Sequence, residues 1–160
     1  MRKTDGLPDS VKDQVGLEVL RNEDSSDGKR KLELKFKGPS QLSIAVSPGS
    51  NWTLGNWSLE VEPFSESFIQ GGRPVYFVFV NKGLNSTDFQ LELELANKQE
   101  NGTALENERI LEILYVAHFL QGDNARTTEF EAVVNKFPAW TNVMAWTSVL
   151  KQYLITPTSS

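Results

Sequence analysis

"DFQLELELAN", residues 88–97, alternates polar and apolar residues from Asp88 to Leu95. Successive side chains of an extended chain point to opposite faces of a sheet. One face of this segment is therefore apolar, and its members are Phe89, Leu91, Leu93 and Leu95. The other face carries amides and carboxylates, at Gln90, Glu92 and Glu94. The segment predicts a β-strand with one face on a core and the other in water.

Strand patterns continue towards the N-terminus. Four further segments alternate in the same way, at 17–21, 32–36, 42–46 and 57–62. The first two flank the turn-rich "NEDSSDG" and predict a hairpin. Val75 to Val80 is apolar throughout and rich in β-branched and aromatic residues, which is typical of a strand covered on both faces or centrally placed. Short strands separated by turns predict a mainly β fold, an antiparallel β-sandwich of jelly-roll-like type.

The C-terminal third is less regular. "ERILEILYVAHFLQG" (108–122) suits a buried helix by its length and a strand by its β-rich surroundings, and we expect a strand from about 110 to 119. "TTEFEAVVNKF" (127–137) predicts one short α-helix, because Thr127 or Thr128 can cap it and a proline follows it. Its apolar residues share one helical stripe, formed by Phe130, Val133, Val134 and Phe137.

The domain organisation follows from these elements. Residues 1–15 are polar and are expected to be a flexible N-terminal segment. Residues 16–156 are expected to form a single β-sandwich domain, followed by a flexible tail at 157–160. No second domain is expected in a chain of 160 residues.

The amino-acid composition argues against several classes of function. The formal net charge of -5 and the pI near 5.0 argue against binding to nucleic acid or to an anionic membrane. Lys31, Lys35 and Lys37 alternate with apolar residues, as on a solvated strand face. No apolar run is long enough to span a bilayer, so we expect no direct membrane insertion by this chain. The absence of cysteine excludes disulfides, thiolate zinc sites and a cysteine nucleophile.

An enzymatic function has little support in the residues. His118 is the only histidine, and zinc hydrolases built on imidazole and carboxylate ligands generally need more. A Ser-His-Asp triad would have to use His118, and no Gly-x-Ser-x-Gly elbow is present. A partly buried structural histidine is the favoured interpretation, and a small hydrolase using His118 is the weaker one.

Four sequons match the N-glycosylation pattern, at Asn51, Asn56, Asn85 and Asn101. Chance alone would give roughly one or two in a chain of this composition. The excess favours a lumenal or extracellular setting. Asn51 and Asn56 are close enough to compete, so we expect at most one of them to be glycosylated efficiently.

Aromatic residues offer an alternative function, a carbohydrate-binding or adhesion module. Trp52, Trp57 and Tyr76 are the candidates for stacking on a sugar. The two tryptophans are an odd number of residues apart and would face opposite sides of an unbroken strand. A shared platform would therefore need a bend between them, which Gly55 could provide.

The end of the chain, "LYVAHFLQGDNARTTEFEAVVNKFPAWTNVMAWTSVLKQYLI" (114–155), resembles the end of the endoplasmic reticulum metallopeptidases. The similar features are the His-aromatic-Leu at 118–120, the Arg-Thr at 126–127, and a short helix that ends in "KFPAW". "GPSQLSIAVSPGSNWTLGNWSLE" and "GGRPVYFVFVNKG" also resemble central strands of that family's C-terminal domain. The resemblance would cover about 16–155.

The resemblance implies that the chain is the C-terminal lumenal β-domain of a membrane-bound zinc aminopeptidase-like enzyme. The zinc and the catalytic residues would lie upstream, so neither a catalytic residue, a metal ligand nor a cofactor is expected in this chain. Its role would be structural or protein-interacting in the endoplasmic reticulum lumen. The expected partners are the catalytic and transmembrane parts of the parent protein and a lumenal protein. The carbohydrate-binding module remains the alternative.

Overall fold

The structure is a computed structural model, and it describes residues 13–25, 28–61, 63, 68–70, 72–83, 88–98, 108–120, 128–141 and 147–158. Within these ranges the chain forms two sheets and one helix, α2 (Thr128–Val134). The four-stranded sheet has the spatial order β1 (Gly16–Asp24), β2 (Lys29–Lys37), β7 (Phe89–Asn97) and β4 (Trp52–Trp57). The five-stranded sheet has the order β5 (Phe68–Gln70), β6 (Arg73–Asn81), β3 (Gln41–Pro48), β8 (Leu111–Phe119) and β9 (Thr147–Ile155).

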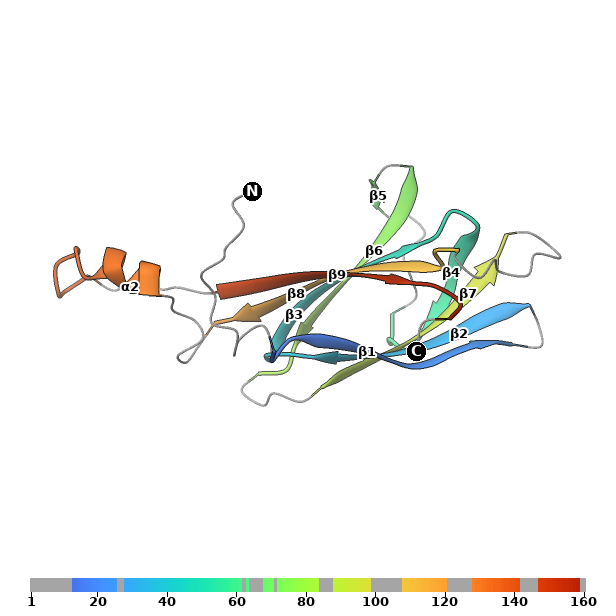
Figure 1. Ribbon diagram of the computed structural model, residues 1–160, viewed down its shortest axis with the longest axis horizontal. Coiled ribbons are helices and arrows are strands. Elements are labelled where there is room, and N and C mark those ends of the chain that lie inside the picture. The colour runs from blue at the N-terminus through green and yellow to red at the C-terminus, as the bar shows by residue number, and fades with distance from the viewer. Residues whose placement is uncertain are drawn as a thin grey trace.

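The two sheets form two layers, with α2 beyond one end of the five-stranded sheet (Figure 1). Every strand pair is antiparallel. The chain crosses repeatedly between the layers, because β2, β4 and β7 lie in one sheet and β3, β6 and β8 in the other. The expected mainly β sandwich with one short helix is therefore confirmed.

The core lies between the sheets and follows the alternation of the sequence. On β2 the buried apolar residues are Leu32, Leu34 and Phe36, opposite Leu93, Leu91 and Phe89 of β7. Leu42, Ile44 and Val46 of β3 face them from the other sheet, beside Ile113, Tyr115 and Ala117 of β8. Each fully buried side chain of this kind contributes about 1.5–3 kcal/mol through the apolar surface that it removes from water.

Tyr115 joins the two sheets directly. Its ring packs edge to face on Phe36 of the opposite sheet, with centroids 5.3 Å apart and planes at 75°. Its hydroxyl donates a hydrogen bond of 2.7 Å to the carbonyl of Lys37. Gly38 leaves room for that hydroxyl, which a Cβ at this position would strike. Burial raises the pKa of Tyr115 well above its usual range, with smaller contributions from Tyr153 and Asp88.

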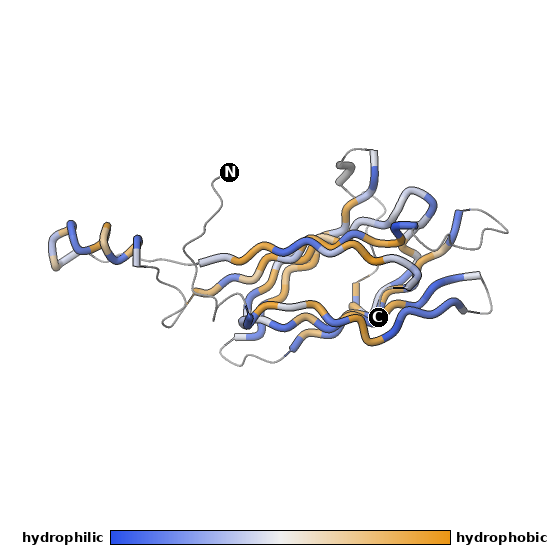
Figure 2. Tube along the Cα trace, viewed as in Figure 1, coloured by the Kyte–Doolittle hydropathy of each residue, from blue (hydrophilic) through white to orange (hydrophobic). Residues whose placement is uncertain are grey.

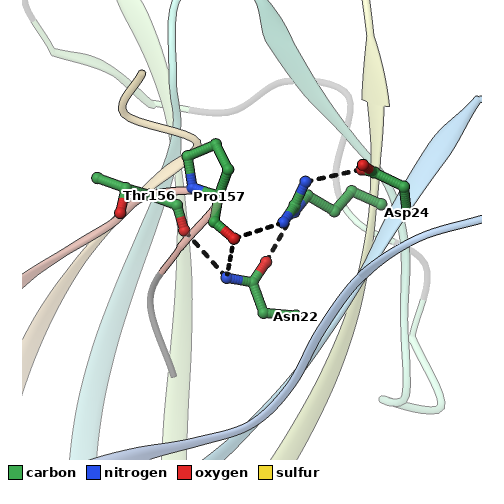
Figure 3. A network of polar contacts seen from close by, with 5 residues as sticks. Asn22, Asp24, Thr156 and Pro157 are labelled. Carbon is green, nitrogen blue, oxygen red and sulfur yellow. Dashed lines mark hydrogen bonds and ion pairs between the residues drawn. The ribbon is translucent and has the colours of Figure 1, made fainter. Parts of the chain in front are cut away.

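A polar clasp, formed by Asn22, Asp24, Arg30, Thr156 and Pro157, connects the sheets at the end of β9 (Figure 3). Arg30 is 4% exposed and donates to Asn22 Oδ1 at 2.7 Å, to Asp24 Oδ1 at 2.7 Å and to the Pro157 carbonyl at 2.8 Å. The Asn22 amide donates to the carbonyls of Thr156 and Pro157, at 2.9 and 3.2 Å. The segment that follows β9 is thereby held against β1 and β2.

Two uncertain segments took the expected form. The strand expected at about 110–119 is β8 (Leu111–Phe119), which pairs with β3 and β9. The helix expected near 127–137 is α2 (Thr128–Val134), but none of its residues is buried. It therefore adds nothing to the core formed by the described residues.

Two expectations are wrong. The strand expected at 57–62 instead ends at Trp57, and residues 58–61 form a bend in which Val61 is 58% exposed. The bend lets the indole N–H of Trp57 donate to the Val61 carbonyl. For Val75 to Val80, the alternative of a central position is confirmed, whereas cover on both faces is wrong for the described part of the chain. β6 lies between β5 and β3, yet Phe77 and Phe79 are 61% and 65% exposed on its outer face.

Candidate functional site

His118 lies between two serines on the outer face of the five-stranded sheet. Its Nε2 is 2.9 Å from Ser43 Oγ, and its Nδ1 is 2.9 Å from Ser148 Oγ. The three residues come from the neighbouring strands β3, β8 and β9. A serine hydroxyl within hydrogen-bond reach of an imidazole is the first requirement of a nucleophile–base pair.

The remaining requirements for acyl transfer are not met there. The group at Nδ1 is a hydroxyl, whereas the serine-protease template uses a carboxylate to stabilise the imidazolium. Ser43 lies inside β3, which pairs with β6 on one side and β8 on the other. The amides around Ser43 are therefore used by the sheet and do not form an oxyanion hole. This environment favours the structural interpretation of His118.

No metal-binding group is found in the part of the chain that the structure describes. There, no three His, Cys, Asp or Glu side chains lie together as ligands would. Glu112 accepts hydrogen bonds from Arg73 and Arg109, each at 3.1 Å, and from Gln152 at 2.6 Å. Those donors already occupy its carboxylate oxygens.

Both tryptophans of "NWTLGNW" face inward. The register of β4 on β7 shifts between Leu54 and Asn56, so a bulge at Gly55 cancels the odd spacing of the two rings. Trp52 is 2% exposed, and among the described residues no acceptor reaches its indole Nε1. Trp57 packs edge to face on Tyr76, with centroids 6.1 Å apart. Gly55 does bring the rings to one side, but that side is the core.

The sequons occupy different environments. Asn51 lies in the turn before β4, and its amide donates to Glu108 Oε1 at 2.9 Å. Asn56 is exposed on the outer face of the four-stranded sheet, opposite Glu94. Asn85 and Asn101 lie outside the described residues.

The outer face of the four-stranded sheet is charged. Ion pairs join Lys29 to Glu94 at 2.7 Å, Lys35 to Asp88 at 3.0 Å and Lys37 to Glu18 at 3.4 Å. The hydrogen bond and the charge of Asp88 raise the pKa of Lys35. A shallow groove of about 350 Å³ runs over this face beside Asn56. The solvated face expected from the alternating lysines is confirmed.

The outer face of the five-stranded sheet carries exposed apolar residues among polar ones, and sequence reasoning did not identify it as a surface. Its large exposed apolar residues are Phe77, Phe79, Leu114, Leu150 and Leu154. Along the Cα trace in Figure 2, hydrophilic colour prevails in β2 and in the part of β1 next to it at their shared turn, and hydrophobic colour is more frequent in the strands of the five-stranded sheet. The available signal was that Val75 to Val80 has no polar residue on either face.

Comparison with known proteins places the chain in a family. A family model described as "Endoplasmic reticulum metallopeptidase 1, C-terminal domain" matches residues 3–153. The chain is 30% identical over 130 residues to endoplasmic reticulum metallopeptidase 1 of Rattus norvegicus, covering 78% of this chain and 13% of that protein. It is 31% identical over 122 residues to the Homo sapiens protein of the same name, covering 72% of this chain and 12% of that protein.

The chain thus spans only about one eighth of the length of the curated relatives that it matches. No solved structure matches it. In the described ranges, no helix has the length and hydropathy needed to cross a membrane. The family match covers nearly the whole chain, and the matched family is a C-terminal domain. The chain therefore belongs to the family of endoplasmic reticulum metallopeptidase 1 C-terminal domains.

Proposed function

We propose that this chain is the non-catalytic C-terminal β-domain of a membrane-bound zinc metallopeptidase, with a structural or protein-interaction role on the lumenal side of the endoplasmic reticulum. The match of residues 3–153 to a family defined as a C-terminal domain carries the proposal. The relatives bear the name metallopeptidase, yet the region similar to this chain is about one eighth of their length. The zinc and the catalytic groups of such an enzyme belong, on this proposal, to another part of the polypeptide.

The surroundings of His118 support a non-catalytic role. The imidazole contacts two hydroxyls, and the described residues around it provide neither a carboxylate partner nor an oxyanion hole. A protein-interaction role is supported by the exposed apolar residues on the outer face of the five-stranded sheet, because exposed apolar patches of this kind mark interaction sites. The partners proposed are the catalytic and transmembrane parts of the parent protein, and a lumenal protein.

The experiment is a zinc and peptidase assay on the purified 160-residue chain. After dialysis against a buffer that contains zinc, we expect metal analysis to find much less than one zinc ion per chain. We also expect no cleavage of a panel of aminopeptidase substrates, with or without added zinc. Tight stoichiometric zinc, or cleavage that disappears in His118→Ala, would overturn the non-catalytic assignment. An equal trace rate in the wild type and in His118→Ala would identify a contaminant.

The lumenal setting is tested by expression behind a secretory signal. We expect glycan at Asn56, whose side chain is exposed, in preference to Asn51, whose amide is bonded to Glu108. Glycopeptide mass spectrometry of the wild type and of Asn56→Gln measures this directly. Complete absence of glycan at all four sequons would count against the lumenal assignment.

The geometry does not favour the carbohydrate-binding alternative. Trp52 is almost fully buried, and Trp57 and Tyr76 pack on each other, so these rings offer little open face for a sugar to stack on. Titration of a glycan panel followed by tryptophan fluorescence tests it. A saturable shift that is lost in Tyr76→Ala would restore this alternative.

A further inference from the structure

One end of the outer face of the five-stranded sheet is polar, and an exposed aromatic ring lies beside it. The register places four polar residues side by side on neighbouring strands, and this polar row consists of Asn81, Gln41, His118 and Ser148. The row is roughly 14 Å long, because neighbouring strands lie about 4.8 Å apart. Phe79 and Ser43 are paired with each other two residues further along β6 and β3, so they share the face of the polar row. Phe79 is 65% exposed, which leaves most of its side chain open to a ligand.

The two amides of the polar row have hydrogen-bonding groups that the described residues do not use. Asn81 Oδ1 accepts a hydrogen bond of 3.1 Å from the backbone N–H of Gly83. Among the described residues, none accepts from the Asn81 side-chain NH2, and none bonds the side-chain amide of Gln41. A side-chain amide can both donate and accept, so this half of the row can bind a ligand group of either kind.

The imidazole of His118 leaves a further donor in the other half of the row. It bonds Ser43 through Nε2 and Ser148 through Nδ1. In either neutral tautomer, one ring nitrogen donates and the other accepts. The serine that accepts from the ring therefore retains its own O–H, and the described residues give that O–H no acceptor. The other serine donates to the ring and retains a lone pair, so the pair of hydroxyls offers one donor and one acceptor.

A groove gives this end of the sheet room for a ligand. Its volume is about 390 Å³, which is near the lower end of the range for small-molecule sites. Gln41, Asn81 and His118 line it, together with Leu120, which is 39% exposed. Polar groups and an apolar side chain thus face the same hollow, as in sites where a few polar groups orient a ligand.

The chemistry of these groups favours a neutral ligand rich in hydroxyls. The polar row, Ser43 and Phe79 include no carboxylate, ammonium or guanidinium group. The ammonium of Lys82 donates to the Asp88 carbonyl and lies 5.4 Å from the ring centroid of Phe89. A peptide cannot add to the sheet here as a strand, because β3 and β8 are paired on both sides. A sugar has hydroxyls that both donate and accept, and its C–H groups can pack on the face of an aromatic ring.

We propose that the polar row, Ser43 and Phe79 form a binding site for a neutral saccharide, about the size of a disaccharide. One sugar ring stacks on Phe79, and its hydroxyls bond the side-chain amides of Gln41 and Asn81. The site is separate from the aromatic residues of the carbohydrate-binding alternative, because Trp57 and Tyr76 pack on each other elsewhere in the sandwich. The proposal goes beyond the proposed function and does not depend on zinc, on peptidase activity or on the lumenal setting.

The test is saturation-transfer difference NMR on the 160-residue chain, with maltose, cellobiose, mannobiose and N,N′-diacetylchitobiose as probes. We expect a saturable signal from at least one of them at millimolar concentration. Phe79→Leu keeps the apolar bulk but removes the flat ring, and should weaken binding roughly fivefold. Gln41→Ala removes the amide and should weaken binding roughly threefold to tenfold. Leu154→Ala is the matched control, because Leu154 is 56% exposed at the other end of the same face, and it should bind as the wild type does.

The wild type provides a second measurement, because the side-chain NH2 signals of Gln41 and Asn81 should shift during the titration in ¹⁵N-resolved spectra. No signal from any of the four sugars, or unchanged affinity in both Phe79→Leu and Gln41→Ala, would overturn the proposal. An equal loss of affinity in Leu154→Ala would overturn it too, because the ligand would then bind away from the polar row. Tighter binding of glucose 6-phosphate than of glucose would contradict a neutral ligand.

Discussion

Arg30 tests whether the polar clasp holds the sandwich together, and the decisive change is Arg30→Met. Methionine keeps most of the aliphatic stem and removes the guanidinium. The bonds to Asn22 Oδ1 and to the Pro157 carbonyl are lost, each worth about 1.5 kcal/mol or more for a charged donor. Asp24 is 68% exposed, so its ion pair adds less than about 1 kcal/mol. We expect the free energy of unfolding to fall by about 3 kcal/mol.

Equilibrium urea denaturation measures this loss, provided that the slope of the unfolding transition is unchanged. For a domain of this size the loss corresponds to a fall in Tm of about 6–12 °C. Lys37→Met is the matched control on the same strand, because the ion pair of Lys37 with Glu18 is about half exposed and 3.4 Å long. It should cost less than about 1 kcal/mol. If Arg30→Met costs no more than Lys37→Met, the clasp does not stabilise the sandwich.

Three further changes probe the core. Gly49→Ala should destabilise by about 2–3 kcal/mol in urea, because its Cβ would collide with the backbone carbonyl of Arg109; a neutral effect would contradict that close approach. Trp52→Phe should cost less than about 1.5 kcal/mol and Trp52→Ala about 3–5 kcal/mol, because the described residues give the indole N–H no acceptor; equal losses would mean that this N–H is bonded. Burial raises the pKa of Tyr115 in the folded state, so the unfolded state loses this proton first. Stability should therefore be complete below about pH 10 and fall as the pH rises further, with a smaller fall in Tyr115→Phe; an identical pH dependence in the two proteins would exclude Tyr115 as the cause.

The alternating strands could be predicted from the sequence because one face of each lies on the core. Leu32, Leu34 and Phe36 are buried, as their spacing requires. By the same alternation, Arg30 lies on the inner face. The local sequence does not indicate this position, because Arg30 is a charged residue in a lysine-rich segment and its partners Asn22 and Pro157 lie elsewhere in the chain. Those partners are brought together by the sheet and are not visible in the local pattern.

The errors near Trp57 and on β6 have separate causes. The alternation of residues 57–62 indicates a strand, but it does not show that the chain bends after Trp57 and leaves Val61 exposed. For β6, an apolar run indicates that the side chains on both faces favour burial. It does not indicate which part of the molecule would cover the outer face. The Ser43, His118 and Ser148 group could not be derived either, because its members come from three strands that are adjacent only after the sheet has formed.

The order of the strands also governs how the chain folds during synthesis. β2 is bonded to β1 on one side and to β7 on the other, and β7 leaves the ribosome only after four other strands. The edge of β2 that pairs with β7 therefore stays unpaired until that strand has been synthesised. Such non-local pairing slows folding, because the entropy cost of closing the loop precedes the stabilising contacts between the two strands. Transiently exposed apolar surface and unpaired strand edges make a folding intermediate prone to aggregation, so the nascent chain is exposed to that risk until β7 has been released.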